Sequence, residues 1–427
     1  MKYFLFSFIL FQSVIFTLNS FGVPDGSFYY QNAVYKDEIK SVQLFPDGAP
    51  LSMPVIGLGT SQQLVLKFDN VSGATPSYSY TLIHCDADWN ESFLSQPEYL
   101  DGFPDNPIDD YALSFNTTAN YVNYQLRLPN ERVKMNCSGN YVLVVFEDGD
   151  RDKLVITQRF YVIQPKVEVR TLVKRATFDP FNGDNQEVDF TVYHPQITLN
   201  DPFMEMKVVL MQNRRWDNAV RNLKPLFVRQ AELDYNYDRE NVFPGGNEFR
   251  YFDIRSWKYN GENVANTGFF DPYYHVTLLT DELRSNKKYF DYREMNGAFS
   301  IESQDRIEDA DTECDYGFVH FTLAMPVPLL GGSVNVFGEL TGWNANQSNE
   351  MLWNAERNEY ELTLFLKQGY YNYEYVYVPK GGAVADAGVI EGNHYDTENE
   401  YHIFVYYKSL SGRYDELVGF QQVSSQN

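Results

Sequence analysis

Residues 141–163 read YVLVVFEDGDRDKLVITQRFYVI, and this stretch decides the fold class. Two runs rich in Val, Leu, Ile, Phe and Tyr flank the polar segment EDGDRD at 147–152. β-Branched and aromatic residues favour strands, and an Asp-Gly pair between two such runs is typical of a hairpin turn. The stretch therefore predicts a β-hairpin with strands at 141–147 and 154–163.

The same pattern continues outward along the chain. Runs of strand-forming residues alternate with Gly, Pro, Asn and Asp at 39–45, 63–68, 78–84, 121–128, 167–173, 187–193, 204–212, 248–254, 274–279, 318–323, 334–338, 360–366 and 401–407. Tyrosines at every second position from Tyr371 to Tyr377 predict a strand with one aromatic face, which is more typical of a core than of a ligand platform. The best helical pattern, 213–223, is short. We therefore predict an all-β protein.

A Gln-Pro pair and an acidic segment divide the chain into three blocks. Gln164-Pro165 ends the first block, and an acidic segment at 302–313 resembles a linker. We expect three consecutive immunoglobulin-like or early-set β-sandwiches: an N-terminal one at 27–164, a middle one with long loops at 165–305, and a C-terminal one at 315–417.

The first 20 residues have the pattern of a secretory signal. Lys2 precedes a mostly apolar stretch at 3–18, and small residues follow it. We expect a signal peptide at 1–20 and an exported protein. The rest of the sequence contains no apolar run of the length that spans a bilayer.

Composition excludes several classes of function. The chain has 427 residues, with 58 Asp and Glu against 34 Lys and Arg, and a formal net charge of -24. This charge argues against nucleic-acid binding and against docking on an anionic membrane, because both need basic patches. Aromatic residues make up 16% of the chain, which argues against disorder.

A search for chemical motifs predicts no catalytic, cofactor-binding or metal-ligating residue. In HCDADWN at 84–90, Asp86, Asp88 and Asn90 resemble the start of a calcium loop, but Glu91 and Pro97 occupy positions that require Gly and Glu. We interpret these acids, like those at 148–152, as turn residues. The six histidines show no metal-ligand spacing on a helix.

The three cysteines, Cys85, Cys137 and Cys314, leave at least one thiol unpaired. Cys85 and Cys137 pair only if their strands are neighbours, which spacing does not decide. No C-x-x-C is present, so buried or incidental thiols are the favoured interpretation.

The C-terminal block resembles a known module. The strand at 334–337 with Gly338, Trp343, Met351, Trp353, the strand at 360–364 and GYY at 369–371 is similar to the early-set immunoglobulin-like modules found beside glucan enzymes. The resemblance implies a β-sandwich. Trp343 and Trp353 are either sugar-stacking residues or, as we favour, loop anchors.

A second resemblance covers nearly the whole chain after the signal. It rests on an ordered series of motifs: IKSVQL at 39–44, LKFD at 66–69, HCDADW at 84–89, EYLDGF at 98–103, SFNT at 114–117, LPN at 128–130, SGNY at 138–141, QNRRWD at 212–217, FPGGNEFR at 243–250, NG at 296–297, LKQGYYNY at 366–373, EGN at 391–393 and TEN at 397–399. The series is similar to the type IX secretion system plug protein family of the Bacteroidota.

This resemblance implies a non-enzymatic periplasmic protein, with no cofactor, that docks on the periplasmic mouth of the outer-membrane translocon barrel. It implies that the protein closes the pore while no substrate is engaged. The residues that bind the barrel are not assigned. Two alternatives stay open: a periplasmic carbohydrate-binding or glycan-hydrolysing protein, and a scaffold of another envelope complex.

Overall fold

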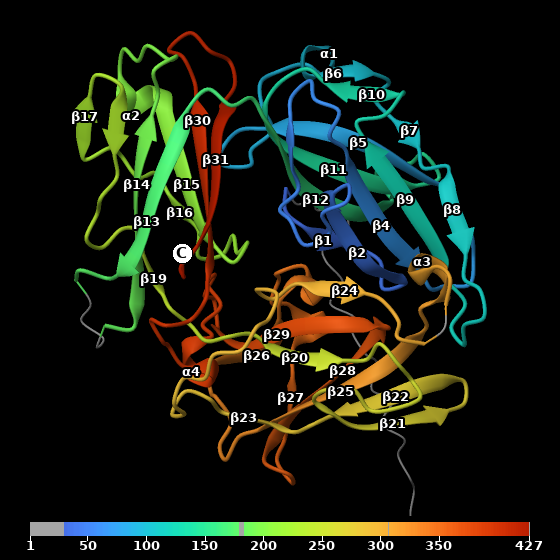
Figure 1. Cartoon of the computed structure of the whole chain (residues 1–427). Coiled ribbons are helices and arrows are strands. Elements are labelled where there is room, and N and C mark those ends of the chain that lie inside the picture. The colour runs from blue at the N-terminus through green and yellow to red at the C-terminus, as the bar shows by residue number, and fades with distance from the viewer. Residues whose placement is uncertain (1–29, 179–182, 306, 427) are drawn as a thin grey trace, which may run out of the picture.

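The computed structural model describes residues 30–178, 183–305 and 307–426, so the predicted signal peptide at 1–20 lies outside the described residues. Within this part, strands β1 to β31 are accompanied by four α-helices of four residues each and two 3-10 turns. The prediction of an all-β, multi-domain sandwich protein is confirmed (Figure 1).

The first sandwich contains every strand up to Ile163. One sheet has the order β1 (Ala33–Val34), β12 (Leu154–Ile163), β11 (Gly139–Glu147), β5 (Tyr78–Cys85) and β7 (Asn106–Pro107), with β3 (Val55–Gly57) beside β12. The other has the order β2 (Ile39–Pro46), β4 (Leu64–Asn70), β9 (Val122–Leu128) and β8 (Asp110–Leu113). The helix α1 (Gln96–Tyr99) and the pair β6 (Leu100–Gly102) and β10 (Val133–Met135) cover one end.

The predicted hairpin is β11 and β12, which pair antiparallel across the 148–153 turn. Asp148 and Gly149 adopt the left-handed backbone conformation, with φ of 56° and 70°, that Asp and Gly accept most readily. Tyr141, Leu143 and Val145 of β11 face the core of the first sandwich, whereas the residues between them pack against the neighbouring sandwich. Both faces are buried, which explains why the run is apolar throughout.

The middle sandwich joins two distant parts of the chain. Its first sheet contains β13 (Glu168–Arg175), β14 (Asn185–Tyr193), β18 (Glu232–Asp234), β17 (Phe227–Arg229) and β19 (Val242–Pro244). Its second sheet has the order β16 (Val220–Arg221), β15 (Met206–Gln212), β30 (Glu400–Tyr407) and β31 (Glu416–Ser424). The helix α2 (Pro202–Glu205) leads into β15.

The third sandwich lies between these two parts in sequence. One sheet pairs β29 (Gly369–Pro379) with β20 (Arg250–Asp253), β24 (Phe299–Ile301) and β26 (Gly332–Phe337). The other has the order β21 (Val264–Phe270), β22 (Tyr273–Leu278), β25 (Tyr316–Ala324), β28 (Glu359–Lys367) and β27 (Leu352–Asn354), with β23 (Asp281–Glu282) beside β25. Two short helices, α3 (Ala310–Glu313) and α4 (Gly388–Glu391), flank it.

Strand pairing differs from the contiguous blocks expected at 165–305 and 315–417. The run at 401–407 was expected to close the C-terminal block, but it pairs with β15 of the middle sandwich. The runs at 248–254 and 274–279 were expected in the middle block, but they pair with β29 and β25 of the third sandwich. Alternation in sequence identifies a strand but not its partner. We propose a middle domain of about 165–245 with 400–424, interrupted by a third domain of about 246–399.

Two smaller expectations were wrong. The segment 213–223 forms turns and β16 instead of a helix, because Asn213 and Arg214 have φ of 48° and 62°, outside the helical region. The acidic segment at 302–313 is not a free linker. Asp305 accepts hydrogen bonds from Ser256, and Asp311 pairs with Lys67 of the first sandwich.

The three sandwiches form a closed ring, in which each contacts the other two. Figure 1 shows the first sandwich in blue to cyan, the middle one in green with β30 and β31 in red, and the third one in yellow to orange. Side-chain contacts join the first to the middle, the first to the third, and the middle to the third.

Candidate functional site

The joint between the first and middle sandwiches is mainly apolar. Trp89 packs edge-on against Tyr161 and Trp216, and the Arg159 guanidinium lies 4.3 Å from its ring centroid. Tyr161 stacks on Phe404 of β30 with ring centroids 4.4 Å apart. These residues belong to one buried cluster that draws on both sandwiches. The cluster therefore acts as a shared core.

A few hydrogen bonds fix the register of this joint. The Asp415 carboxylate accepts from the Ala87 backbone and from Lys207 Nζ, both at 3.0 Å. Tyr406 donates to Asn140 Oδ1 at 2.8 Å. Gly139 is required beside them, because a Cβ there would lie 2.5 Å from His84 Nε2. Burial lowers the pKa of His84, whose ring nitrogen Nε2 lies 3.2 Å from the Ser138 carbonyl.

The joint between the first and third sandwiches is centred on a buried ion pair. Lys367 Nζ of β28 lies 2.7 Å from Asp69 Oδ2 of β4, and both side chains are at most 2% exposed. The same oxygen accepts from Tyr316, and Asn123 donates to the other carboxylate oxygen at 2.8 Å. Lys367 also donates to the Asp311 carbonyl. Every polar atom of this charged pair thus has a partner, as burial demands.

A groove of about 390 Å³ with both polar and apolar walls lies beside this ion pair. Its walls include Lys67, Asp69 and Arg127 of the first sandwich and Ser300 and Lys367 of the third. The three cations of the groove are already paired, with Asp311, Asp47 and Asp69. The groove therefore offers no free positive charge to an anionic ligand.

The middle and third sandwiches are joined where the chain passes between them twice. The two crossings lie side by side, since the His394 amide donates to the Gly246 carbonyl and Asn399 Nδ2 donates to the Gly245 carbonyl. Gly245 is required here, because a Cβ would lie 2.1 Å from the His394 carbonyl oxygen.

Arg215 completes the joint between the middle and third sandwiches. It forms a fork with Asp217 and reaches Glu374 of β29 at 3.4 Å and the Ala385 carbonyl at 2.5 Å. Burial raises the pKa of Glu374 to about 7, although Arg215 acts in the opposite direction. The planar fork of the guanidinium makes this contact directional as well as strong.

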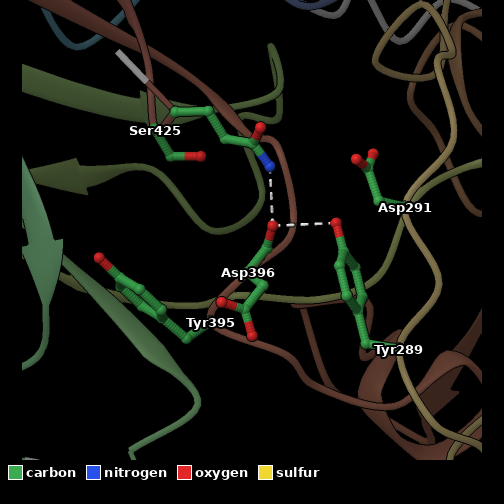
Figure 2. Close-up of a pocket in the computed structure, with 6 residues that line it drawn as sticks. Tyr289, Asp291, Tyr395, Asp396 and Ser425 are labelled. Atoms are coloured by element: carbon green, nitrogen blue, oxygen red, sulfur yellow. Dashed lines mark hydrogen bonds between the residues drawn. The ribbon is translucent and has the colours of Figure 1, made fainter.

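A second, smaller pocket of about 280 Å³ opens at the same joint (Figure 2). Tyr289, Asp291, Tyr395, Asp396, Ser425 and Gln426 line it. Tyr289 and Gln426 both donate to the Asp396 carbonyl at 2.9 Å. These hydrogen bonds join the segments that line the pocket. We therefore interpret the pocket as a gap between packed segments and not as a catalytic site.

The motifs with a chemical appearance have structural roles. Asp86 accepts hydrogen bonds from the backbone of Asp88 and Asn90, as the turn interpretation predicted. Asp148 pairs with Lys153, and Asp150 accepts from the Asp152 backbone, at the tip of the β11–β12 hairpin. Within residues 30–178, 183–305 and 307–426, no three His, Cys, Asp or Glu gather where they could hold a metal ion.

The cysteines and aromatic residues are also accounted for. All three cysteines are free thiols, with Cys85 and Cys314 buried. Tyr371, Tyr373 and Tyr375 are at most 2% exposed and belong to the core of the third sandwich, which confirms the core interpretation. Trp343 contacts Phe249 and Phe337, and Trp353 contacts Tyr360, as the interpretation as anchors expects.

Most of the motifs that carried the family resemblance lie at the three joints. The segments 84–89 and 138–141 belong to the first–middle joint, and 66–69 and 366–373 to the first–third joint. The segments 212–217, 243–250 and 391–399 belong to the middle–third joint.

Some exposed apolar side chains lie on free sheet edges. On β8 and just after it, Tyr111, Leu113 and Phe115 are 53%, 64% and 69% exposed. Phe227 of β17 and Phe270 of β21 are similarly exposed. Sequence reasoning missed these positions, although the period-two spacing of 111, 113 and 115 is visible in the sequence. Such edges suit binding of another protein better than chemistry on a small molecule.

The structure is thus a body of three joined β-sandwiches with free sheet edges, to which a further strand can add. No helix in the described part of the chain is long and apolar enough to cross a membrane. Residues 39–164 match the family model described as type 9 secretion system plug protein 1st domain. The chain thus carries the first domain of the type 9 secretion system plug protein family, which supports a role associated with type IX secretion.

A solved structure supports the fold of the whole chain. The chain is similar to a hypothetical protein from Parabacteroides merdae ATCC 43184, known from a crystal structure. The identity is 38%, the match covers 93% of this chain and 100% of that one, and the TM-score is 0.89. No curated protein matches the sequence.

Proposed function

We propose that the chain is a non-enzymatic plug of the type IX translocon. It docks on the periplasmic mouth of the outer-membrane barrel and closes it while no substrate is engaged. The observation that carries the proposal is the match of residues 39–164, nearly all of the first sandwich, to the first domain of the plug family.

The closed ring of sandwiches supports this proposal. A plug that closes a pore has to keep its shape while it is docked. Each sandwich here is held by two buried joints, so that displacing one sandwich disrupts contacts with both others. Packed, charge-paired joints transmit force as a rigid body, because close-packed interiors compress little. A chain of three sandwiches linked only in series would bend at each linker.

Location follows from the same proposal. A protein that closes the inner mouth of the barrel resides in the periplasm, in peripheral contact with the outer membrane. The net charge of -24 keeps such a body soluble and makes binding depend on a few specific contacts.

The glycan-binding alternative has less support. It was motivated by the Trp and Tyr content of the C-terminal block, and Tyr371, Tyr373 and Tyr375 are buried in the core of the third sandwich. Trp343 and Trp353 contact neighbouring aromatic residues of the protein.

The proposal is tested by deleting the gene and measuring entry of a large hydrophilic antibiotic that does not normally pass the outer membrane. We expect the deletion strain to become sensitive and a plasmid copy to restore resistance. A strain that also lacks the translocon barrel is the control, and should stay resistant. Unchanged sensitivity in the single deletion, or equal sensitivity in both strains, would overturn the proposal.

A further inference from the structure

The edge strand β8 (Asp110–Leu113) is the feature that neither the joints nor the family assignment explains. It pairs with β9 on one side and lies at the outer margin of the first sandwich (Figure 1). Tyr111 is opposite Tyr124, and Leu113 is opposite Val122, both of which belong to the core. The two β8 side chains therefore point toward the inner face of the sandwich, yet more than half of each is exposed.

The backbone of β8 has hydrogen-bonding groups that point outward. The Ser114 amide donates to the Tyr121 carbonyl at 2.8 Å, so position 114 faces β9. Antiparallel pairing alternates along a strand, which directs the N–H and C=O groups of Tyr111 and Leu113 away from β9. At the next outward position, the Phe115 amide donates to the Thr312 carbonyl of α3 at 2.9 Å. The protein itself thus uses one position of this edge and leaves the preceding two open.

Several other edges are shorter or less regular than β8. β21 is longer, but it contains a register shift near Ala265, whose carbonyl accepts from Asn260 Nδ2 at 3.0 Å. β1, β7 and β16 have two residues each, too few to guide a strand. Bulges, short length and capping groups are ways in which proteins block unwanted strand pairing. β8 has four paired residues in regular register, with no bulge and no capping group at Tyr111 or Leu113.

Charge limits which strand this edge can accept. Asp109 and Asp110 directly precede Tyr111 in the chain. Glu308, Asp309 and Glu313 lie in or beside α3, which contacts the same edge at Phe115. Arg132 pairs with Asp109, and the net charge of these residues around the edge stays negative. A second copy of this chain would bring the same acids together and is disfavoured by its net charge of -24.

We propose that β8 binds an extended segment of a partner protein, which adds as a fifth strand to the sheet of β2, β4, β9 and β8. The segment has apolar side chains at alternate positions and Lys or Arg at its ends. Its apolar side chains cover Tyr111, Leu113 and Phe115, its backbone pairs with the open groups of Tyr111 and Leu113, and its basic ends face the acidic residues. The inference is independent of the proposed gating function, because it concerns binding by the isolated protein.

The test measures binding of a dye-labelled peptide, KVTVTVTK, to the whole protein by fluorescence anisotropy. Leu113→Pro removes the outward amide and obstructs the edge, and we expect it to weaken binding at least about tenfold. Val228→Pro makes the same change on the apolar edge β17 and should alter binding less than about twofold. The peptide EVTVTVTE should bind more weakly than KVTVTVTK, and the difference should shrink at high salt.

Circular dichroism and a thermal melt verify that each variant is folded. If Leu113→Pro fails to fold, Leu113→Lys replaces it, since a charge on an exposed edge keeps the backbone intact and still repels the basic peptide. Absence of peptide binding, or equal binding by the two edge variants, would overturn the proposal. A concentration-dependent dimer in sedimentation velocity that disappears with the Leu113 variant would also overturn it, because the occupant would then be a second copy.

Discussion

The two joints of the first sandwich are built from different chemistry. Its joint with the middle sandwich is a shared apolar core, with Trp89 and Tyr161 packed against Trp216 and Phe404. Its joint with the third sandwich is centred on the buried pair of Asp69 and Lys367, beside a groove of about 390 Å³. The joint with the middle sandwich is held by close apolar packing. In the joint with the third sandwich, hydrogen bonds and an ion pair compensate the buried charges.

The apolar joint is expected to tolerate small rearrangements, whereas the ion pair specifies one relative position of the two sandwiches. An apolar core loses stability roughly in proportion to the volume removed, and it tolerates small rearrangements. A buried ion pair contributes little net stability, but it penalises any arrangement that separates the charges. We infer that the apolar joint supplies most of the cohesion, while the ion pair fixes the position of the third sandwich.

The largest effect is expected at the ion pair. Lys367→Met should lower the free energy of unfolding by about 3–5 kcal/mol, because it leaves the Asp69 carboxylate buried and unpaired. The double variant Lys367→Met with Asp69→Asn should recover much of this loss, since the charge is gone and an acceptor remains for Tyr316. Denaturant unfolding measures both. A double variant less stable than the single one would show that the charge is not the cause.

The apolar joint should respond to volume. Phe404→Ala should cost about 3 kcal/mol in the free energy of unfolding, because it opens a cavity beside Tyr161. Phe420→Ala removes the same atoms at the rim, where the side chain is only partly buried, and should cost less. The same denaturant series at low and high salt should give equal losses for Phe404→Ala. A strong salt dependence would contradict the apolar character of this joint.

Acid should weaken the apolar joint through His84. Burial lowers the pKa of His84 in the folded protein, so the unfolded chain takes up the proton first. The stability from neutral His84 is present above the unfolded pKa of about 6.5 and is lost as the pH falls. His84→Phe keeps a ring against Tyr141 and Tyr414, and should make unfolding less sensitive to pH between 7.5 and 5.5. Identical pH profiles for the two proteins would count against this assignment.

The smallest effect is expected outside both joints. Leu113→Lys on β8 should change the free energy of unfolding by less than about 0.5 kcal/mol, because the side chain is 64% exposed. A thermal melt measures it directly. A large loss would mean that Leu113 belongs to the core of the first sandwich and not to a surface for partners.

Local sequence signals predicted much of the fold. The hairpin of β11 and β12, the tyrosines of β29 and the turn roles of Asp86 and Asp148 follow from alternation and turn chemistry, which act between near neighbours. Sheet partners were harder to predict. β15 pairs with β30, almost 200 residues later, and alternation carries no information about such a distant partner.

The joints were the part least accessible from sequence. Asp69 and Lys367 are 298 positions apart, and no sequence motif around either residue indicates that they form an ion pair. The motifs at 84–89 and 212–217 both combine polar residues with Trp. The first includes the residues that resemble the start of a calcium loop, and the second overlaps the best helical pattern at 213–223. Their structure shows the reason for that composition: a joint needs an aromatic side chain to bury and polar groups to fix its register.

The most direct test of the central claim is an electrical one. The purified translocon barrel is placed in a planar bilayer, and this protein is added to its periplasmic side while the conductance is recorded. We predict that the open-pore conductance falls to a closed level and recovers when the protein is washed out. A conductance that stays unchanged at saturating protein, with binding to the barrel verified, would contradict the assignment as a plug.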